Sequence, residues 1–522
     1  MPEEGNRPVS FKPTAFQQYL LIFCVTLLGA LPFVVNDTIL LDDILHYNGL
    51  DQWVFNWTIQ IRRPMHALTS LMFGNFANFA PTSTLMVALS VSLFGFVFAS
   101  KLLSDPIERI CVALLFTTSP IFIDHWQYGV NHAPLTFAFI AFSLGVYFYK
   151  ADATSLTANW RSYLCFLFVS TTKQDFALFS FILILFFTFH LHLFGKEKLE
   201  PKIAFRRYAR AVFEILAIVI GYFLLTELLI QIFQPNTPMP TEYQTDIDLG
   251  LEVFAPRLER IGTFMVTFLL QAQAHYPIGL KMLSLAVLLL SLTSIFSRFG
   301  ARIGLLVVLF LALILVMSLS IGLLREYDST YRYTGLGALM LFYPMVLLFG
   351  LKAGLAQRSS PVWLVIMGMI FFSSVIEVAK AGSEAATETK RNFGLISQIT
   401  AEAALHSNPE RQIYIIDNCD AIDHVPNLPG WDLIVKTPKV WQTSMLQKGG
   451  LWCQSGLSKW LWTLTVPVDM ERILAEELTI PLLSPAELSK EQLDLIKAAE
   501  TSGELKSGLS ALSENFYVFK LP

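Results

Sequence analysis

The chain has 522 residues, of which 54% are hydrophobic and only 15% are charged, and its mean hydropathy is +0.53. A soluble chain would carry about 25% charged residues, so this composition excludes an ordinary soluble protein. The net charge of −4 and the pI near 6.2 give no indication of nucleic-acid binding. The apolar residues cluster in blocks of about 20, the length that crosses about 30 Å of hydrocarbon. The composition therefore indicates a membrane protein.

The apolar blocks predict an all-α polytopic protein with about 11 transmembrane helices. No small-residue cleavage site follows the first block, so we expect a retained helix and not a signal peptide. Two blocks are short, which is tolerated where the following backbone is buried in protein. The stretch 261–274 is interpreted as a re-entrant or interfacial helix, since a full span there would invert everything after it. The predicted spans are residues 16–35, 81–100, 106–121, 134–149, 160–172, 174–194, 211–233, 278–297, 303–324, 334–351 and 361–379.

The loop charges predict the orientation of these spans. If the N-terminus is cytoplasmic, the inside segments collect most Lys and Arg residues, and the outside loops collect carboxylates. The basic cluster from Lys196 to Arg210 is then interpreted as a topological signal that contacts anionic lipid. The region after about Lys380 falls on the outer side. We therefore expect a multi-pass protein of the bacterial inner membrane with a periplasmic C-terminal region.

The C-terminal region has a different character from the rest of the chain. Residues 1–380 are predicted to form the transmembrane domain, and residues 381–522 a small soluble α/β domain. Strand patterns are at 412–417 and 517–521, and helical patterns at 384–405, 473–478 and 485–499. Cys419 and Cys453 pair in an oxidising periplasm or remain two unlinked thiols, and the spacing leaves both alternatives open.

No soluble-enzyme or metal motif is present in the sequence. There is no Walker A loop, dinucleotide glycine pattern, HExxH or CxxC pair. Cys24, Cys111 and Cys165 lie in predicted spans and supply no zinc framework. The motifs therefore indicate neither a nucleotide-cofactor site nor a zinc site.

Polar residues gather instead in four stretches at the predicted outer face. Ionisable groups at membrane depth are costly to bury, so they mark a pathway or a site. The stretches are Asp42-Asp43 through Arg62-Arg63-Pro64, then Thr118 through His132 with the run Asp124-His125-Trp126-Gln127-Tyr128, then Thr171 through Asp175, and finally Arg325 through Tyr333.

The order of these motifs resembles the large membrane glycosyltransferases of the GT-C architecture, which take a sugar from a polyprenyl-phosphate carrier. Within that class it is most similar to the bacterial glucosyltransferases that convert the serotype of O-antigen. One departure is Thr172-Lys173-Gln174, where the family pattern implies an aromatic residue before the glutamine. The resemblance covers about 380 residues and rests on Asp42-Asp43 with the Arg-Pro element, Ser119-Pro120 followed by Tyr128 and Asn131, Gln174 after a span, and Arg332-Tyr333.

The chemistry of such a transfer fits these residue types. Asp42 or Asp43 would take the proton from the acceptor hydroxyl, and neighbouring carboxylates raise one another's pKa. The leaving phosphate needs cations. In-line attack on the anomeric carbon is predicted to invert its configuration. The resemblance implies an enzyme that works without a required metal, so neither a metal nor another cofactor is expected. The expected phosphate-binding residues are Arg62, Arg63, Lys173, Arg325 and Arg332, and the expected substrate-binding residues are Asp124, Tyr128, Asn131, His132 and Gln174. The expected partners are the lipid bilayer, a polyprenyl-phosphate-linked hexose such as glucose, and a cell-envelope glycan or lipid acceptor.

Several alternatives stay open at the level of sequence. Asp43 suits a helix N-cap, which favours Asp42 as the base. Arg62-Arg63 suits an interfacial anchor, and His132 suits a buried histidine with satisfied nitrogens. An O-antigen polymerase, a lipid-linked sugar flippase or transporter, or a non-catalytic assembly protein would also have many spans with charged outer loops. A transporter would usually show two matching halves, and the sequence shows none.

Overall fold

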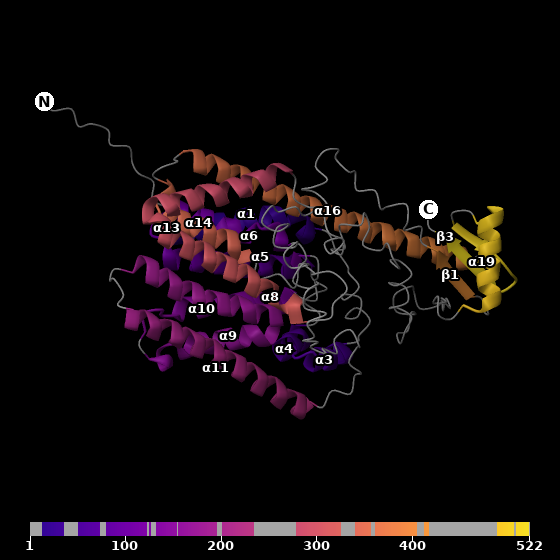
Figure 1. Cartoon of the computed structure of the whole chain (residues 1–522). Helices are drawn as coiled ribbons and strands as arrows, with labels where there is room; N and C mark the ends of the chain where they lie inside the picture. Colours follow the sequence, from indigo (N-terminus) through magenta and orange to yellow (C-terminus); the bar gives the residue numbers. More distant parts are fainter. Residues whose placement is uncertain are drawn as a thin grey trace.

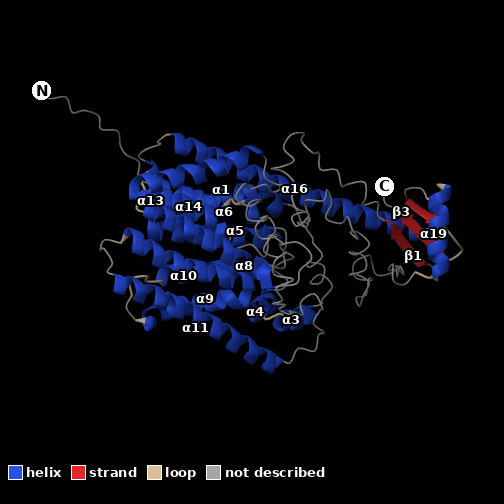
Figure 2. Cartoon of the chain, in the orientation of Figure 1, coloured by secondary structure: helices blue, strands red, loops and turns tan. Residues whose placement is uncertain are grey.

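The protein is mostly helical, with long helices side by side in one bundle and a small sheet at the far end of α16 (Figures 1 and 2). Two turns of 3₁₀ helix, η2 (Pro120–Phe122) and η4 (Leu156–Asn159), lie among the connections. The computed structural model describes residues 13–35, 51–73, 80–122, 125–126, 132–153, 155–195, 201–233, 278–324, 340–356, 361–404, 412–416, 488–505 and 508–520.

Each predicted span coincides at least in part with a helix of the bundle. Within the described residues, six helices are long and apolar enough to cross a membrane: α1, α5, α10, α11, α13 and α16. The prediction of a helical multi-pass membrane protein is confirmed at this level, whereas the count of about 11 spans stays a prediction. The α-helices of the bundle are α1 (Ala15–Val35), α3 (Asp51–Gln60), α4 (Pro64–Phe73), α5 (Ala80–Leu102), α6 (Pro106–Thr117), α8 (His132–Phe148), α9 (Trp160–Thr172), α10 (Gln174–Phe194), α11 (Pro201–Phe233), α13 (Ile278–Leu324), α14 (Phe342–Lys352) and α16 (Val362–Ala404).

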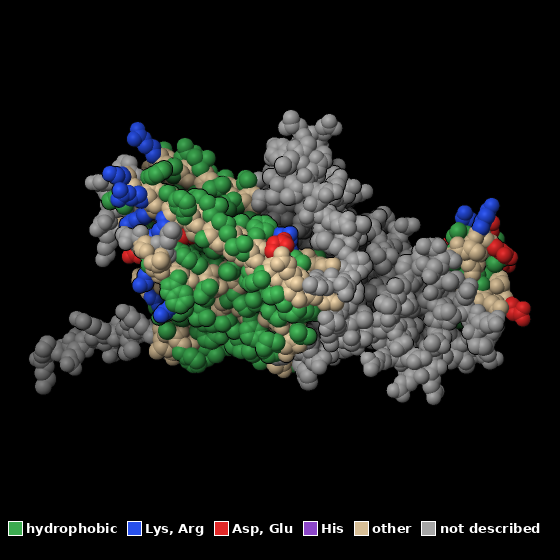
Figure 3. All heavy atoms as spheres, turned by 90° about the horizontal axis from the view of Figure 1, so that it is seen from below, with side chains coloured by type: hydrophobic (Ala, Val, Ile, Leu, Met, Phe, Trp, Pro, Cys, Tyr) green, Lys and Arg blue, Asp and Glu red, His purple; other side chains and the backbone are tan. Residues whose placement is uncertain are grey.

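Phenylalanine rings fill the core where α5, α6, α8 and α10 meet. Phe94 is fully buried, and its ring centroid lies within 6.0 Å of five other phenylalanine rings. Most of these pairs are tilted, the arrangement that aromatic quadrupoles favour. The periphery is apolar as well: only 11% of the most hydrophobic window of α11 is buried, and a broad hydrophobic face is visible in Figure 3. This outer surface suits a lipid environment.

Helix α13 is two arms joined at Gly300. Gly300 has φ 79° and ψ 173°, a backbone conformation that favours glycine. A Cβ placed on Gly304 would lie 2.5 Å from the ring of Phe296, although residues eight apart in a straight helix are separated by about 12 Å. The chain therefore bends sharply at Gly300, which lies between the predicted segments 278–297 and 303–324.

The described C-terminal elements form a three-stranded sheet with one helix. The strand order is β1-β3-β2, with β1 (Gln412–Ile416) parallel to β3 (Phe516–Lys520) and β2 (Gly508–Ala511) antiparallel to it. Helix α19 (Lys490–Ser502) begins at a Ser489–Gln492 capping box.

The predicted strands at 412–417 and 517–521 match β1 and β3 to within one residue. The predicted helix at 485–499 overlaps α19, which begins five residues later, and the sequence analysis does not predict β2. Helix α16 runs without a loop through the predicted domain boundary at 380/381. The predicted helix at 473–478 and both Cys419 and Cys453 lie outside the described residues, so an α/β domain over 381–522 stays a prediction.

Candidate functional site

The two ends of the bundle differ in chemistry. At one end, basic side chains surround the C-terminus of α8: Lys101 Nζ donates to the Val146 carbonyl at 2.6 Å, and Arg210 Nη2 to the Ala151 carbonyl at 2.7 Å. Figure 3 shows further Lys and Arg side chains gathered at one end of the hydrophobic face. The opposite end is formed by α3, α4, the N-terminus of α8 and the junction of α9 with α10. We call this opposite end the α4 end, because α4 packs there against both α8 and α9.

The α4 end brings together the described parts of three of the four predicted polar stretches. Arg62 and Arg63 precede α4, His132 begins α8, and Lys173 joins α9 to α10. Gln174 is the first residue of α10, and its side chain lies outside the described part of the chain. Also outside the described residues are Asp42, Asp43, Asp124, Tyr128, Asn131, Arg325 and Arg332.

Lys173 is a buried ammonium at the junction of two helices. It alone separates α9 from α10, with an extended backbone at φ −151° and ψ 132°. The residue is only 8% exposed, and its Nζ lies 6.0 Å from the centroid of the Phe176 ring. The single-residue break thus holds a positive charge inside the protein at the α4 end.

His132 is a histidine with both ring nitrogens engaged. Its Nδ1 lies 2.9 Å from Ser83 Oγ, and its Nε2 lies 3.2 Å from the Trp126 carbonyl. A carbonyl only accepts, so Nε2 donates to Trp126 and Nδ1 accepts from the serine hydroxyl. This geometry favours the interpretation of His132 as a satisfied structural histidine over a substrate-binding role.

His125 lies in the second predicted polar stretch, but no pattern in the sequence assigns it a role. Its side chain is fully buried, with its ring centroid 4.8 Å from Phe122 and 6.2 Å from Phe176. Neither ring nitrogen has a hydrogen-bond partner among the described residues. Burial lowers the pKa of His125 well below its usual range, and the charge of Lys173 acts in the same direction. His125 is therefore a neutral imidazole beside a buried cation.

Arg62 occupies a position that normally belongs to glycine. Its φ is 63°, in the left-handed region, and its N–H donates to the Ile59 carbonyl at 3.0 Å. The Arg63 N–H donates to the Thr58 carbonyl at 2.9 Å, which completes a Schellman motif at the end of α3. Non-glycine residues in this region are strained, and such strain is concentrated at functional sites.

Arg62, in the turn between α3 and α4, makes three contacts with α11. Arg62 Nη2 pairs with Glu227 Oε1 at 2.6 Å, and the guanidinium carbon lies 5.6 Å from the Phe223 ring centroid. The Tyr222 hydroxyl donates to the Arg62 carbonyl at 3.1 Å. A phosphate at Arg62 would therefore share the guanidinium with a carboxylate. Arg63 is different, since its buried Nε has no hydrogen-bond partner among the described residues.

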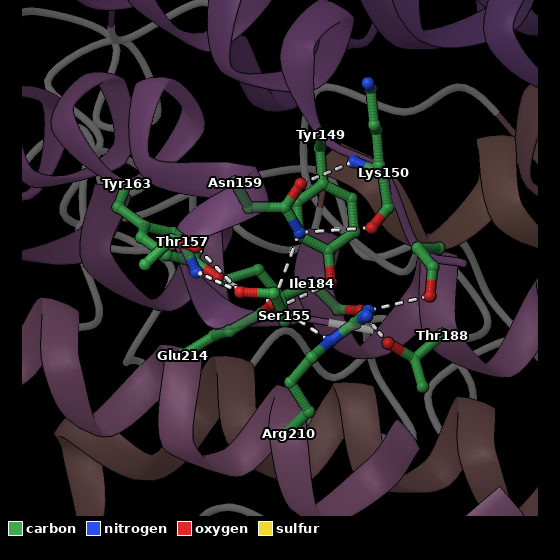
Figure 4. Close-up of polar contacts among 11 residues, drawn as sticks. Tyr149, Lys150, Ser155, Thr157, Asn159, Tyr163, Ile184, Thr188, Arg210 and Glu214 are labelled. Atoms are coloured by element: carbon green, nitrogen blue, oxygen red, sulfur yellow. Dashed lines mark hydrogen bonds and ion pairs between the residues drawn. The ribbon is translucent and has the colours of Figure 1, made fainter. Parts of the chain in front are cut away.

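A second polar cluster lies at the basic end, around the fully buried carboxylate of Glu214 (Figure 4). Glu214 Oε1 accepts from the Tyr163 hydroxyl at 2.7 Å and from Asn159 Nδ2 at 3.2 Å, and pairs with Arg210 Nε at 3.1 Å. Glu214 Oε2 accepts from the Tyr149 hydroxyl at 2.8 Å. We call these five residues the Glu214 cluster. A carboxylate with this many donors is suited to holding helices together.

The Glu214 cluster corrects one interpretation of the sequence. Arg210 was assigned to the lipid-contacting basic cluster, but it is only 8% exposed and pairs with Glu214 one helical turn later. The i,i+4 spacing of Arg210 and Glu214 was the available signal, because residues at that spacing lie on the same helix face.

Among the described residues, no group of His, Cys, Asp and Glu side chains is placed to hold a metal ion.

The fold and the α4 end define the class of protein: a helical multi-pass membrane protein with cationic and imidazole groups at one end of its bundle. No family model matches the chain, and no curated protein matches it either.

Proposed function

We propose that the protein is a membrane glycosyltransferase that moves a hexose such as glucose from a polyprenyl-phosphate carrier to a cell-envelope glycan or lipid. The observation that carries the proposal is the placement of Arg62, Arg63 and Lys173 at the same end of the bundle, the α4 end. The leaving group of this reaction is a phosphate, which arginine forks and a lysine point charge recognise well. The apolar outer surface suits a donor whose polyprenyl tail stays in the bilayer.

In this proposal the α4 end faces the periplasm. About 11 spans with a cytoplasmic N-terminus place the opposite, basic end in the cytoplasm, as the distribution of Lys and Arg favours. Asp42 or Asp43 then removes the proton from the acceptor hydroxyl while the acceptor oxygen attacks the anomeric carbon. The bond from that carbon to the phosphate oxygen breaks, and the phosphate leaves with the cations beside it. Acceptor recognition is assigned to the C-terminal region, which follows the last predicted span on the same side.

Single D42N and D43N variants and the double variant test the base. Sugar transfer is measured in isolated membranes with a labelled polyprenyl-phosphate hexose. We expect the variant that lacks the base to lose transfer by about 100-fold or more, the usual scale of general-base catalysis. Full activity in all three variants would remove the base assignment.

Asp105 offers a matched control at the other end of the bundle. Its carboxylate caps α6 by accepting from the Ile107 and Glu108 N–H groups at 2.9 and 3.1 Å. Asparagine caps helices about as well as aspartate, so D105N is expected to transfer sugar at the wild-type rate.

The envelope glycans of cells with and without the protein test the reaction class. Mass spectrometry is expected to show a difference of one hexose on a glycan or lipid. A change in polymer length without that mass difference would indicate the polymerase alternative and overturn the proposal.

A further inference from the structure

His125 is a buried polar group whose hydrogen-bonding capacity the described protein does not use. Its side chain is 0% exposed, and both of its ring nitrogens lack a partner among the described residues. Leaving a buried donor or acceptor without a partner destabilises the protein. His132, seven residues later, shows the contrast, because both of its nitrogens are engaged. A ligand that supplies the missing partner would recover this free energy.

The surroundings of His125 define the chemistry of that ligand. The Phe176 ring is a neighbour of both groups, with its centroid 6.2 Å from the imidazole centroid of His125 and 6.0 Å from Lys173 Nζ. The imidazole and the ammonium therefore both lie near the same buried aromatic ring. A neutral imidazole offers one N–H donor and an ammonium offers three. An oxyanion is the ligand class that accepts from both.

We propose that His125 and Lys173 bind a phosphate monoester, with a ring N–H of His125 donating to a phosphate oxygen. The isoprenyl tail assigned to this ligand comes from the proposed function, and the apolar outer surface of the bundle is compatible with a lipid tail. The identification of this phosphate with the leaving group rests on the proposed function, whereas the anion site itself does not. His125 acts as a ligand-binding residue in addition to the cations expected from the sequence.

The test measures binding and stability in the same variants. The full chain is reconstituted in phosphatidylcholine nanodiscs and titrated with citronellyl phosphate, a short isoprenyl monophosphate, or with inorganic phosphate alone. H125F keeps an aromatic ring of similar size and removes both nitrogens, and K173M removes the charge. Each is expected to bind citronellyl phosphate about tenfold more weakly or worse, the scale of a hydrogen bond to a charged group.

A matched control exists on α10. His190 also has a buried ring nitrogen, Nε2, without a hydrogen-bond partner among the described residues, and its ring lies 5.0 Å from that of Phe194 at the basic end. H190F is expected to bind the probe as the wild type does. The unliganded H125F protein is expected to unfold at the wild-type temperature or above it, because removing an unsatisfied polar group from a buried place is neutral or stabilising.

Wild-type affinity in H125F, equal losses in H125F and H190F, or no binding of either probe by the wild type would each overturn the site. If H125F fails to fold, H125Q and H125A replace it in the test. H125Q keeps an amide donor group and a carbonyl acceptor, so it is expected to bind more tightly than H125A. Equal binding by these two variants would overturn the site. Inorganic phosphate that binds as tightly as citronellyl phosphate would support the anion site and overturn its isoprenyl ligand. If H125F loses binding while the Asp42 and Asp43 variants transfer sugar at the wild-type rate, the anion site is supported and the assignment of Asp42 or Asp43 as the base is rejected.

Discussion

Replacing Glu214 with leucine is the sharpest test of how the basic end of the bundle is held together. The substitution removes a fully buried carboxylate that pairs with Arg210 at 3.1 Å. It also takes the acceptor from the hydroxyls of Tyr149 and Tyr163 and from the amide of Asn159. E214L therefore leaves a cation and three further donors without their carboxylate.

The expected loss is large, because one charge of a buried pair is left behind. Removing one partner of a buried ion pair costs about 3–5 kcal/mol, whereas replacing both partners by apolar groups of similar volume is often nearly neutral. Arg210 is 8% exposed, so solvent screens the abandoned charge only slightly. We expect E214L to lower the free energy of unfolding by about 3–5 kcal/mol, and E214L/R210M to recover more than half of that loss.

The assay is thermal or denaturant unfolding of the purified chain in one detergent, with wild type, E214L, R210M and E214L/R210M measured side by side. The four proteins form a double-mutant cycle, and its interaction free energy measures the coupling of the two charges directly. An E214L protein as stable as the wild type would refute the reasoning. A double variant whose loss of stability equals the sum of the E214L and R210M losses would also refute it. The two residues would then contribute independently.

Two further predictions concern backbone positions. A Cβ on Gly350 would lie 2.6 Å from Ser291 Oγ and 2.9 Å from Ser291 Cα, so G350A is expected to destabilise the protein by about 1–3 kcal/mol. Gly368 has no described atom within 4 Å of such a Cβ, and G368A serves as the control whose unfolding temperature does not fall. At the left-handed Arg62, R62G and R62A both lose the ion pair with Glu227, but only R62G relieves the backbone strain. R62G is expected to be more stable than R62A by about 1 kcal/mol in the same unfolding assay, and the reverse order would contradict the strain argument.

The apolar helices could be predicted from the sequence because the thickness of the hydrocarbon fixes their length. The bend at Gly300 could be anticipated in the same way, since the charged residues Arg298 and Arg302 interrupt the apolar run around it. Helix α16 shows where this reasoning ends. Its apolar segment stops at Lys380, but the helix continues to Ala404, because polar residues also form helices when nothing breaks them.

The polar contacts of the site could not be predicted, because they depend on which segments meet in space. Glu214 draws three of its donors from residues 51 to 65 positions away in the chain. The left-handed Arg62 violates the local preference for glycine, so no turn signal marked it. His125 and His132 have the same chemistry in the sequence, and only the burial and the neighbours of each ring distinguish them.

Helix α16 connects the bundle to the small C-terminal sheet as one continuous helix. Its 43 residues correspond to about 65 Å at 1.5 Å per residue, about twice the thickness of the hydrocarbon. A Cβ on Gly382 would lie 2.9 Å from Phe33 and Pro32, so α16 packs closely against the end of α1 before it leaves the bundle (Figure 1). Beyond Gly382 the helix continues to Ala404 and carries the sheet away from the bundle. A small change in the tilt of α16 where it packs against α1 would therefore displace the sheet by a much larger distance.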